Sequence, residues 1–261
     1  MSTLHEKIKI LILGDSGVGK SSLLELLCHG QAIGNPQWTI GCSIDVKLHQ
    51  YKEGTAAQKT CYIELWEVGG SRSHAIARKI FFNSFDGIIL VQDLTNGKSE
   101  HNLKNWLGKA LAVESDMKEQ KSSVLDSATI SQALFPVSSD LDYEYDPESF
   151  IGCDQIPVLI AATKLDQIPD SERCNVESNK HHLADSLKCD LIYVNARNSK
   201  SIAPGTTNAV KVSRYFDKVA DKKFRSTMAH LGGWSSSTGS NLQQRTNTQQ
   251  YSINNLLFTN K

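Results

Sequence analysis

The sequence predicts an α/β fold in which a mostly parallel, six-stranded sheet carries helices on both faces. Apolar runs of strand length alternate with stretches of helical periodicity along most of the chain. These runs are almost continuously apolar, which is typical of parallel strands that are buried on both sides. The 261 residues suffice for one ordinary core with extensions, and we predict that the domain occupies residues 1–225.

The first half of the chain supplies four of the predicted strands. The first apolar run is followed by a helical pattern, and the next two runs are joined by a turn near Gly54, which predicts an antiparallel hairpin. The fourth run is apolar throughout its centre, as expected for a buried strand. The predicted elements are a strand at Lys7–Leu13, the start of a helix at Ser22–His29, strands at Ser43–Glu53 and Lys59–Glu67, and a strand at Gly87–Asp93.

The second half alternates helices with the two remaining strands. A helical pattern with apolar residues on one face, Trp106 among them, precedes the fifth strand, and a more polar helix leads to the sixth. The last helix has an apolar face that includes Tyr215 and Phe216. The predicted elements are helices at Glu100–Met117, Glu172–Leu187 and Asn208–Phe224, and strands at Val158–Thr163 and Leu191–Val194.

Two segments depart from this alternation. Residues Glu119–Gln155 are polar and separate a helix from the strand after it by far more than the usual few residues. We therefore predict a surface insertion at residues 119–155. Residues 226–261 are rich in Ser, Thr, Asn, Gln and Gly, a composition that predicts a disordered, low-complexity tail.

The composition argues against several classes of function. Lys and Arg total 28, as do Asp and Glu, so the formal net charge is zero and we expect no nucleic-acid partner. The six cysteines form no C-x-x-C pair, which favours reduced, mostly buried thiols in a cytoplasmic protein. No apolar stretch is long enough to span a membrane, residue 2 is Ser, and the last cysteine is Cys189, so we expect no direct membrane anchor.

A phosphate-binding motif follows the first strand. Residues Gly14–Ser21 read G-D-S-G-V-G-K-S, which matches G-x-x-x-x-G-K-[ST] between a strand and a helix. The glycines let backbone N–H groups turn toward phosphate oxygens, Lys20 adds a positive charge, and the Ser21 hydroxyl can ligate Mg²⁺. The alternative, a chance glycine-rich turn, does not account for so complete a match. We predict the P-loop NTPase fold, with the phosphates bound by Gly17, Val18, Gly19, Lys20, Ser21 and Ser22.

A second motif bears on the identity of the base. The strand Val158–Thr163 leads into T-K-L-D, and Asp166 can accept hydrogen bonds from the N1–H and the amino group of guanine. Adenine lacks both donors in that geometry, and the aliphatic stem of Lys164 can lie across the base. By pattern alone, an ordinary polar strand end explains these four residues equally well. Their position after the phosphate-binding motif favours GTP or GDP as the ligand.

Together these motifs resemble those of the Ras superfamily of small GTPases, and within it the Rab-like branch. T-K-L-D resembles the base motif N-K-x-D, and W-T-I-G at Trp38–Gly41 and L-W-E-V-G-G at Leu65–Gly70 resemble the two switches. V-N-A-R at Val194–Arg197 stands in the place of S-A-K, and the resemblance covers about residues 7–224. It implies that Mg²⁺ is held by Ser21, Thr39 and Glu67, that Lys20, Thr39 and Gly70 act at the terminal phosphate, and that the base is bound by Thr163, Lys164, Asp166, Ala196 and Arg197.

The chain departs from the family pattern where hydrolysis is performed. The family has a Gln directly after the last Gly of the second switch to orient the attacking water, whereas this chain has Ser71, whose side chain is too short. Glu67 replaces the Asp that acts on Mg²⁺, and Ser16 adds a side chain near the terminal phosphate. We therefore expect very slow intrinsic GTP hydrolysis.

The base-binding part departs as well. Thr163 replaces the Asn whose amide ties the base motif to the P-loop, and residues 30–36 contain no aromatic ring to cover the edge of the guanine. Trp38 is adjacent to Thr39, and we expect it to face the sheet or a partner. These differences predict weaker nucleotide retention than in a typical Rab protein.

Three functions are compatible with these motifs. The first is a regulatory switch that recruits effector and regulator proteins through Thr39–Asp45 and Gly69–Ile80 in its GTP state. The second is an interaction scaffold or homodimeric adaptor in which the nucleotide is mainly structural, and nucleotide-dependent partner binding separates it from the first. The third is a P-loop ATPase or kinase, against which Asp166 argues and which base competition tests. We favour the switch.

Overall fold

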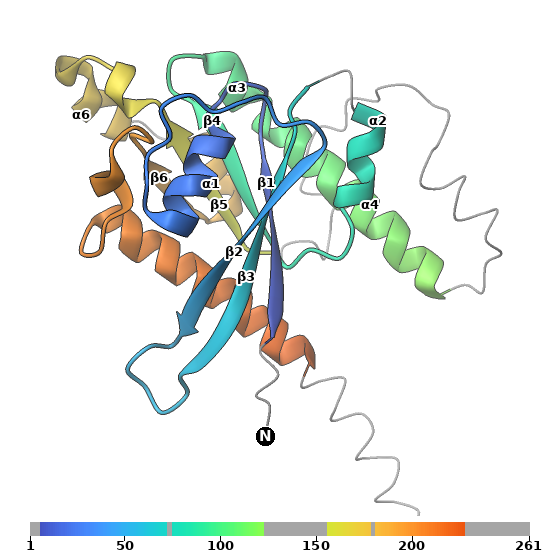
Figure 1. The fold of residues 1–261 in the computed structure, drawn as a ribbon. Helices are drawn as coiled ribbons and strands as arrows, with labels where there is room; N and C mark the ends of the chain where they lie inside the picture. Colours follow the sequence, from blue (N-terminus) through green and yellow to red (C-terminus); the bar gives the residue numbers. More distant parts are fainter. Residues whose placement is uncertain (1–5, 72–74, 123–155, 179–180, 228–261) are drawn as a thin grey trace, which may run out of the picture. The chain divides into compact units, whose positions relative to one another are not determined.

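The computed structural model describes residues 6–71, 75–122, 156–178 and 181–227 (Figure 1). The chain divides into two compact units, residues 1–220 and 221–261. The first unit contains the sheet and its helices, and in the second unit residues 221–227 are described and helical. Residues 123–155 of the predicted insertion and residues 228–261 of the predicted tail lie outside the described residues.

The described strands form one six-stranded sheet in which one strand is antiparallel to its neighbour. The order across the sheet is β2-β3-β1-β4-β5-β6, and the antiparallel pair is β2 with β3, the predicted hairpin. The predicted α/β class with a mostly parallel sheet is therefore confirmed. The first, fourth and fifth strands have their predicted bounds, and ends of the other three are displaced by one or two residues. The strands are β1 (Lys7–Leu13), β2 (Cys42–Tyr51), β3 (Lys59–Val68), β4 (Gly87–Asp93), β5 (Val158–Thr163) and β6 (Asp190–Tyr193).

Helices connect the strands, and two predicted helices are each interrupted. The predicted helix at Glu100–Met117 is two helices that meet at Asn102, where the first of them ends, and the predicted helix at Glu172–Leu187 is described as two shorter ones. The helices are α1 (Lys20–His29), α2 (Ala75–Arg78), η2 (Lys79–Phe81), α3 (Gly97–His101), α4 (Leu103–Ser122), η4 (Leu165–Gln167), α6 (Asp170–Ser178), α7 (His182–Leu187), η5 (Ser199–Ile202) and a last helix at residues 207–220 of the first unit.

Side chains of β1 alternate between the two faces of the sheet, and each face is covered by helices (Figure 1). On one face Leu11 and Leu13 belong to a core cluster that also contains Trp106 of α4. On the other face the last helix lies so close to β4 that a Cβ on Gly87 would be 2.8 Å from Val219. This burial on both sides explains why the central strands β1, β4 and β5 are almost continuously apolar.

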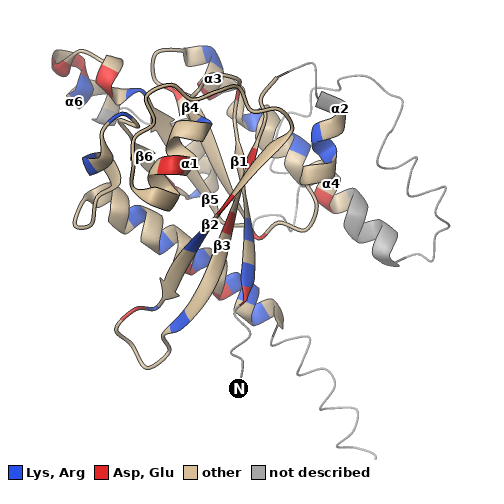
Figure 2. Ribbon diagram, in the orientation of Figure 1, with Lys and Arg blue, Asp and Glu red and all other residues tan. Residues whose placement is uncertain are grey.

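The thiols and the charges of the described residues can be compared with expectation. Five described cysteines are free, and of these Cys61 is buried, Cys174 is exposed and the others are partly buried, so the expectation of mostly buried thiols is only partly met. No helix among the described residues has the length and hydropathy needed to cross a bilayer. Acidic and basic residues are interspersed over the described elements, in keeping with the zero net charge (Figure 2).

Candidate functional site

A cavity of about 540 Å³ lies at the carboxyl ends of β1, β3, β5 and β6, where α/β sheets bind their ligands. Its volume is in the usual range for small-molecule sites. Every predicted site residue except Val18 lines this cavity, and Val18 is buried beside it with 2% of its surface exposed. The structure thus brings together Gly17, Gly19, Lys20, Ser21, Ser22, Thr39, Glu67, Gly70, Thr163, Lys164, Asp166, Ala196 and Arg197.

The P-loop is shaped by close backbone approaches. A Cβ on Gly14 would lie 2.3 Å from the carbonyl oxygen of Val91, so only glycine lets the loop pass β4. Lys20 begins α1, is buried, and donates hydrogen bonds from Nζ to the carbonyl oxygens of Gly14 (3.0 Å) and Asp15 (2.7 Å). Burial lowers the pKa of Lys20 to about 8, against the opposing effect of nearby acidic groups. A desolvated ammonium at the floor of a cavity is suited to binding an anion.

The three predicted metal ligands converge. The Ser21 and Thr39 hydroxyls both donate to Oε1 of Glu67, at 2.7 and 2.8 Å, and lie 3.2 Å from each other. Glu67 is 2% exposed at the end of β3. Octahedral Mg²⁺ with bonds of about 2.1 Å separates adjacent oxygen ligands by about 3.0 Å, and it prefers oxygen donors. The donor set and its spacing therefore fit Mg²⁺.

The second switch touches the P-loop through Gly70. A Cβ on Gly70 would lie 2.5 Å from the backbone nitrogen of Ser16 and 2.6 Å from the carbonyl carbon of Asp15, so no other residue fits there. The next residue, Ser71, also lines the cavity, and its carbonyl oxygen accepts a hydrogen bond from Arg78. The side chain of Ser71, unlike that of Gln, has no amide group with which to orient a water molecule.

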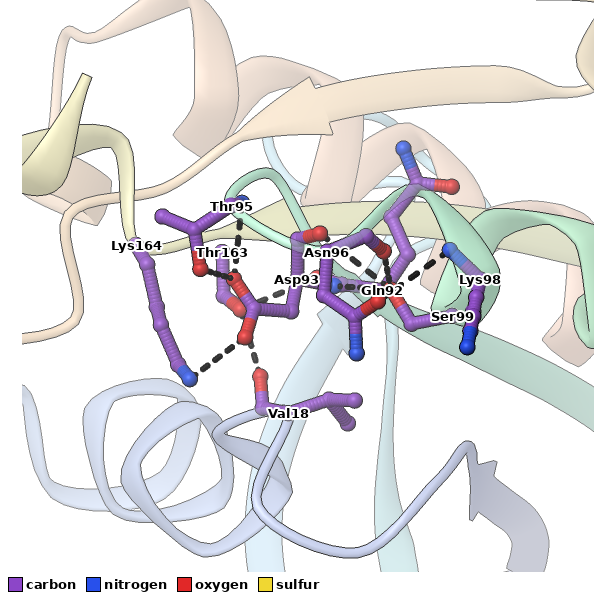
Figure 3. Close-up of polar contacts among 9 residues, drawn as sticks. All are labelled: Val18, Gln92, Asp93, Thr95, Asn96, Lys98, Ser99, Thr163 and Lys164. Carbon is purple, nitrogen blue, oxygen red and sulfur yellow. Dashed lines mark hydrogen bonds and ion pairs between the residues drawn. The ribbon is translucent and has the colours of Figure 1, made fainter.

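At the base end of the cavity, Lys164 forms an ion pair with an acidic residue of β4 (Figure 3). Its Nζ lies 2.5 Å from Oδ2 of Asp93, and the N–H and hydroxyl of Thr95 donate to the other carboxylate oxygen. Burial raises the pKa of Asp93, but the hydrogen bonds from Lys164 and Thr95 outweigh it, so the pKa is lowered. Lys164 has left-handed backbone geometry, with φ of 61°. The backbone geometry sets where the Lys164 side chain begins, and the ion pair with Asp93 holds its ammonium group beside the cavity.

Thr163 joins the base motif to the P-loop, and this corrects one expectation. Its hydroxyl lies 2.5 Å from the carbonyl oxygen of Val18 and 2.9 Å from that of Gln92 (Figure 3). The replacement of Asn by Thr was expected to remove the tie between the two motifs, but the tie is present. A hydroxyl carries one proton for two acceptors, whereas an amide carries two. The connection is therefore retained with one donor fewer.

Asp166 and the V-N-A-R segment lie side by side at the same end. Asp166 is in η4, and the N–H of Leu165 donates to the carbonyl oxygen of Val194 at 3.3 Å. The side-chain oxygen of Asn195 accepts a hydrogen bond from the Arg197 N–H at 2.9 Å, which turns the chain after β6. Asp166, Ala196 and Arg197 thus line the cavity from two adjacent loops.

The sequence reasoning missed several residues of this site. Asp93 was detectable as a carboxylate at the end of a buried parallel strand. Ile33 and Trp38 line the cavity, and Trp38 is 84% exposed, so of its two expected positions, against the sheet or against a partner, the first is excluded. Trp38 belongs to the W-T-I-G motif but was not predicted to line the site, and no sequence signal distinguishes Ile33 from other residues of an irregular segment.

The chain is similar to known proteins. A family model described as the Ras of Complex, Roc, domain of DAPkinase matches residues 9–124. Rab-like protein 3 of Xenopus tropicalis is 46% identical over 223 residues, which cover 84% of this chain and 87% of that protein. Rab-like protein 3 of Mus musculus (45%) and of Homo sapiens (44%) match over the same length, covering 84% of this chain and 86% of each relative.

Proposed function

Because this chain belongs to the Rab-like protein 3 family of small GTPases, we propose that it binds GTP and GDP and serves as a regulatory switch for protein partners, with very slow hydrolysis. The observation that carries this proposal is the position of Lys20 and Asp166, far apart in sequence, in one cavity. The first is suited to phosphates and the second to guanine. A cavity with both groups favours a guanine nucleotide over other phosphorylated ligands.

The residues of the cavity divide the work of binding GTP. Lys20 and the P-loop N–H groups would hold the outer phosphates, and the Gly70 N–H would meet the terminal one. Ser21, Thr39 and Glu67 would hold Mg²⁺, which neutralises phosphate charge when it is bound. Asp166 would accept the guanine donors, with Lys164 along the base. Ser71 leaves the attacking water without an orienting side-chain amide, so bound GTP would be hydrolysed very slowly.

Partner recruitment is proposed for exposed apolar residues of the two switch segments. Ile40 is 82% exposed, Ile44 48% and Ile80 40%, and all three lie in the two segments predicted to contact partners. Exposed apolar side chains in these two segments would be available for contact with a partner. Because Thr39 directly precedes Ile40, a contact of Thr39 with Mg²⁺ in the GTP state would order the adjoining surface.

A homodimeric adaptor is the second candidate, and the edge strand β2 favours it. Ile44, Val46 and Leu48 alternate along β2 and are each about half exposed, and the outer edge of β2 has no neighbouring strand among the described residues. Exposed edge strands with apolar side chains associate readily, and two-fold symmetry is the common outcome. Light scattering over a range of concentrations, in both nucleotide states, tests it, and a constant monomer mass would exclude the dimer.

Fluorescent-nucleotide competition tests the leading proposal. The purified protein is loaded with a fluorescent GDP analogue, and unlabelled GDP, GTP and ATP are titrated in the presence of Mg²⁺. We expect GDP and GTP to displace the analogue and ATP to fail at the same concentrations. Displacement by ATP at similar concentration would refute guanine recognition, and no binding of any nucleotide would refute the function altogether.

A further inference from the structure

A buried arginine contacts the residue that stands in place of the family's Gln. Arg78, the last residue of α2, is 8% exposed, and its guanidinium donates a hydrogen bond to the carbonyl oxygen of Ser71. Removing a guanidinium from water is costly unless it is paired. A four-residue helix gains little stability of its own. The position of Arg78 is therefore explained by its tertiary contacts.

The second contact of Arg78 is with α4. The guanidinium carbon lies 4.7 Å from the centre of the Trp106 ring, close enough for a cation–π interaction. Trp106 in turn donates from its indole N–H to Oδ1 of Asp15 at 2.8 Å, and Asn102 donates to Oδ2 of the same carboxylate at 2.7 Å. Asp15 is a P-loop residue, so α4 connects Arg78 to the phosphate-binding loop.

These contacts close into a ring. Gly70 approaches the backbone between Asp15 and Ser16 too closely for any side chain, and the Ser71 carbonyl is held by Arg78. The path therefore runs from the P-loop through Trp106 and Arg78 to Ser71, and returns through Gly70 to the P-loop. Arginine suits this place better than lysine, because its planar fork can donate to a carbonyl while its face lies on an aromatic ring.

We propose that Arg78 is a positioning residue that holds Gly70 and Ser71 against the P-loop, so that the Gly70 N–H meets the terminal phosphate of GTP. The proposal rests on the proposed binding of guanine nucleotides. GDP lacks the terminal phosphate, so the contribution of Arg78 concerns GTP and not GDP. Because this chain lacks the Gln amide, the contacts of Arg78 with Ser71 and Trp106 are what keeps the second switch rigid.

The test measures the affinities of Arg78 variants for GDP and for a non-hydrolysable GTP analogue. Arg78→Met removes the hydrogen bond to Ser71 and the cation–π interaction with Trp106. Arg78→Lys keeps the positive charge but loses the planar guanidinium. Lys104→Met is the matched control, because Lys104 is an exposed cation on α4 two residues before Trp106. Thermal unfolding of each protein with bound GDP reports whether a variant is merely damaged.

We expect Arg78→Met to lower the ratio of GTP-analogue affinity to GDP affinity by about tenfold, the effect of losing one charge-assisted hydrogen bond. Arg78→Lys should change the ratio in the same direction, and it decides the question if the methionine variant does not fold. Lys104→Met should leave the ratio unchanged. An unchanged ratio in the Arg78 variants, or an equal loss of affinity for both nucleotides, would overturn the proposed role of Arg78. Failure of the wild-type protein to bind GDP would instead refute the proposed function.

Discussion

The base end of the cavity and the second switch differ in which contacts of the small-GTPase family pattern they keep. At the base end Thr163 replaces Asn, yet its hydroxyl still reaches the P-loop carbonyl of Val18, and Lys164 and Asp166 line the cavity. At the second switch Ser71 replaces Gln, and its side chain is too short to orient the attacking water. A substitution that preserves a contact is tolerated in a binding site, whereas one that removes a functional group changes the chemistry. The comparison supports a site that binds GTP but hydrolyses it slowly.

The largest expected effect concerns the base end. Asp166→Asn replaces a carboxylate acceptor by an amide and leaves one guanine donor facing an N–H group. We expect the preference for GDP over ATP to fall by about a hundredfold, because a desolvated charge-assisted pair is lost. Competition against a fluorescent GDP analogue measures it, with Asp170→Asn as the control on the exposed start of α6. A variant that retained the wild-type preference would show that another residue reads the base.

The next effect concerns pH and the phosphate end. Lys20 in the nucleotide-free protein has a pKa of about 8, and phosphate oxygens favour its protonated form. Above pH 8 the binding of GDP must take up a proton, so the dissociation constant should rise about tenfold per pH unit. Titration at several pH values with a fluorescent GDP analogue measures this. A dissociation constant that stayed flat between pH 8 and 9.5 would contradict it.

Raising the pH above 8 should weaken GDP binding, but through the same group, Lys20, it should stabilise the folded protein. The pKa is lowered from 10.5 in the unfolded chain to about 8 in the folded protein, so the unfolded chain binds more protons between these values. This group alone therefore raises the free energy of unfolding as pH increases from 8 to 10.5. Denaturant unfolding of nucleotide-free wild type and of Lys20→Met isolates the contribution, because the variant lacks the titrating group.

A smaller effect is expected at Thr163. Thr163→Val leaves the buried carbonyl oxygens of Val18 and Gln92 without the hydroxyl donor, which should lower the free energy of unfolding by about 1 to 2 kcal/mol and speed GDP release. Thr163→Ser keeps the hydroxyl and serves as the control. Thr163→Asn supplies a second donor and should slow GDP release. Equal rates of GDP release from the Val and Ser variants would show that the hydroxyl does not connect the base motif to the P-loop.

Much of the fold was predictable because its strands are marked by continuous apolar runs and its first loop by glycines. The break between α3 and α4 was not, because the helical pattern continues across Asn102 and the end of α3 depends on local capping. Asp166 and Lys20 were predictable from short motifs, since neighbours in sequence define them. The contacts of Thr163 with Val18 and of Arg78 with Trp106 join distant segments, and no local pattern contains them.

Phosphate release in a single turnover, from protein loaded with GTP and freed of excess nucleotide, tests the contrast between the two ends most directly. The account predicts that bound GTP is hydrolysed no faster than the roughly 10⁻⁴ s⁻¹ of an unassisted Ras-type site. Ser71→Gln, measured in parallel, should be faster than the wild type. A wild-type rate of several per second, as in a site assisted by an activating protein, would show that another residue orients the water and would contradict the account.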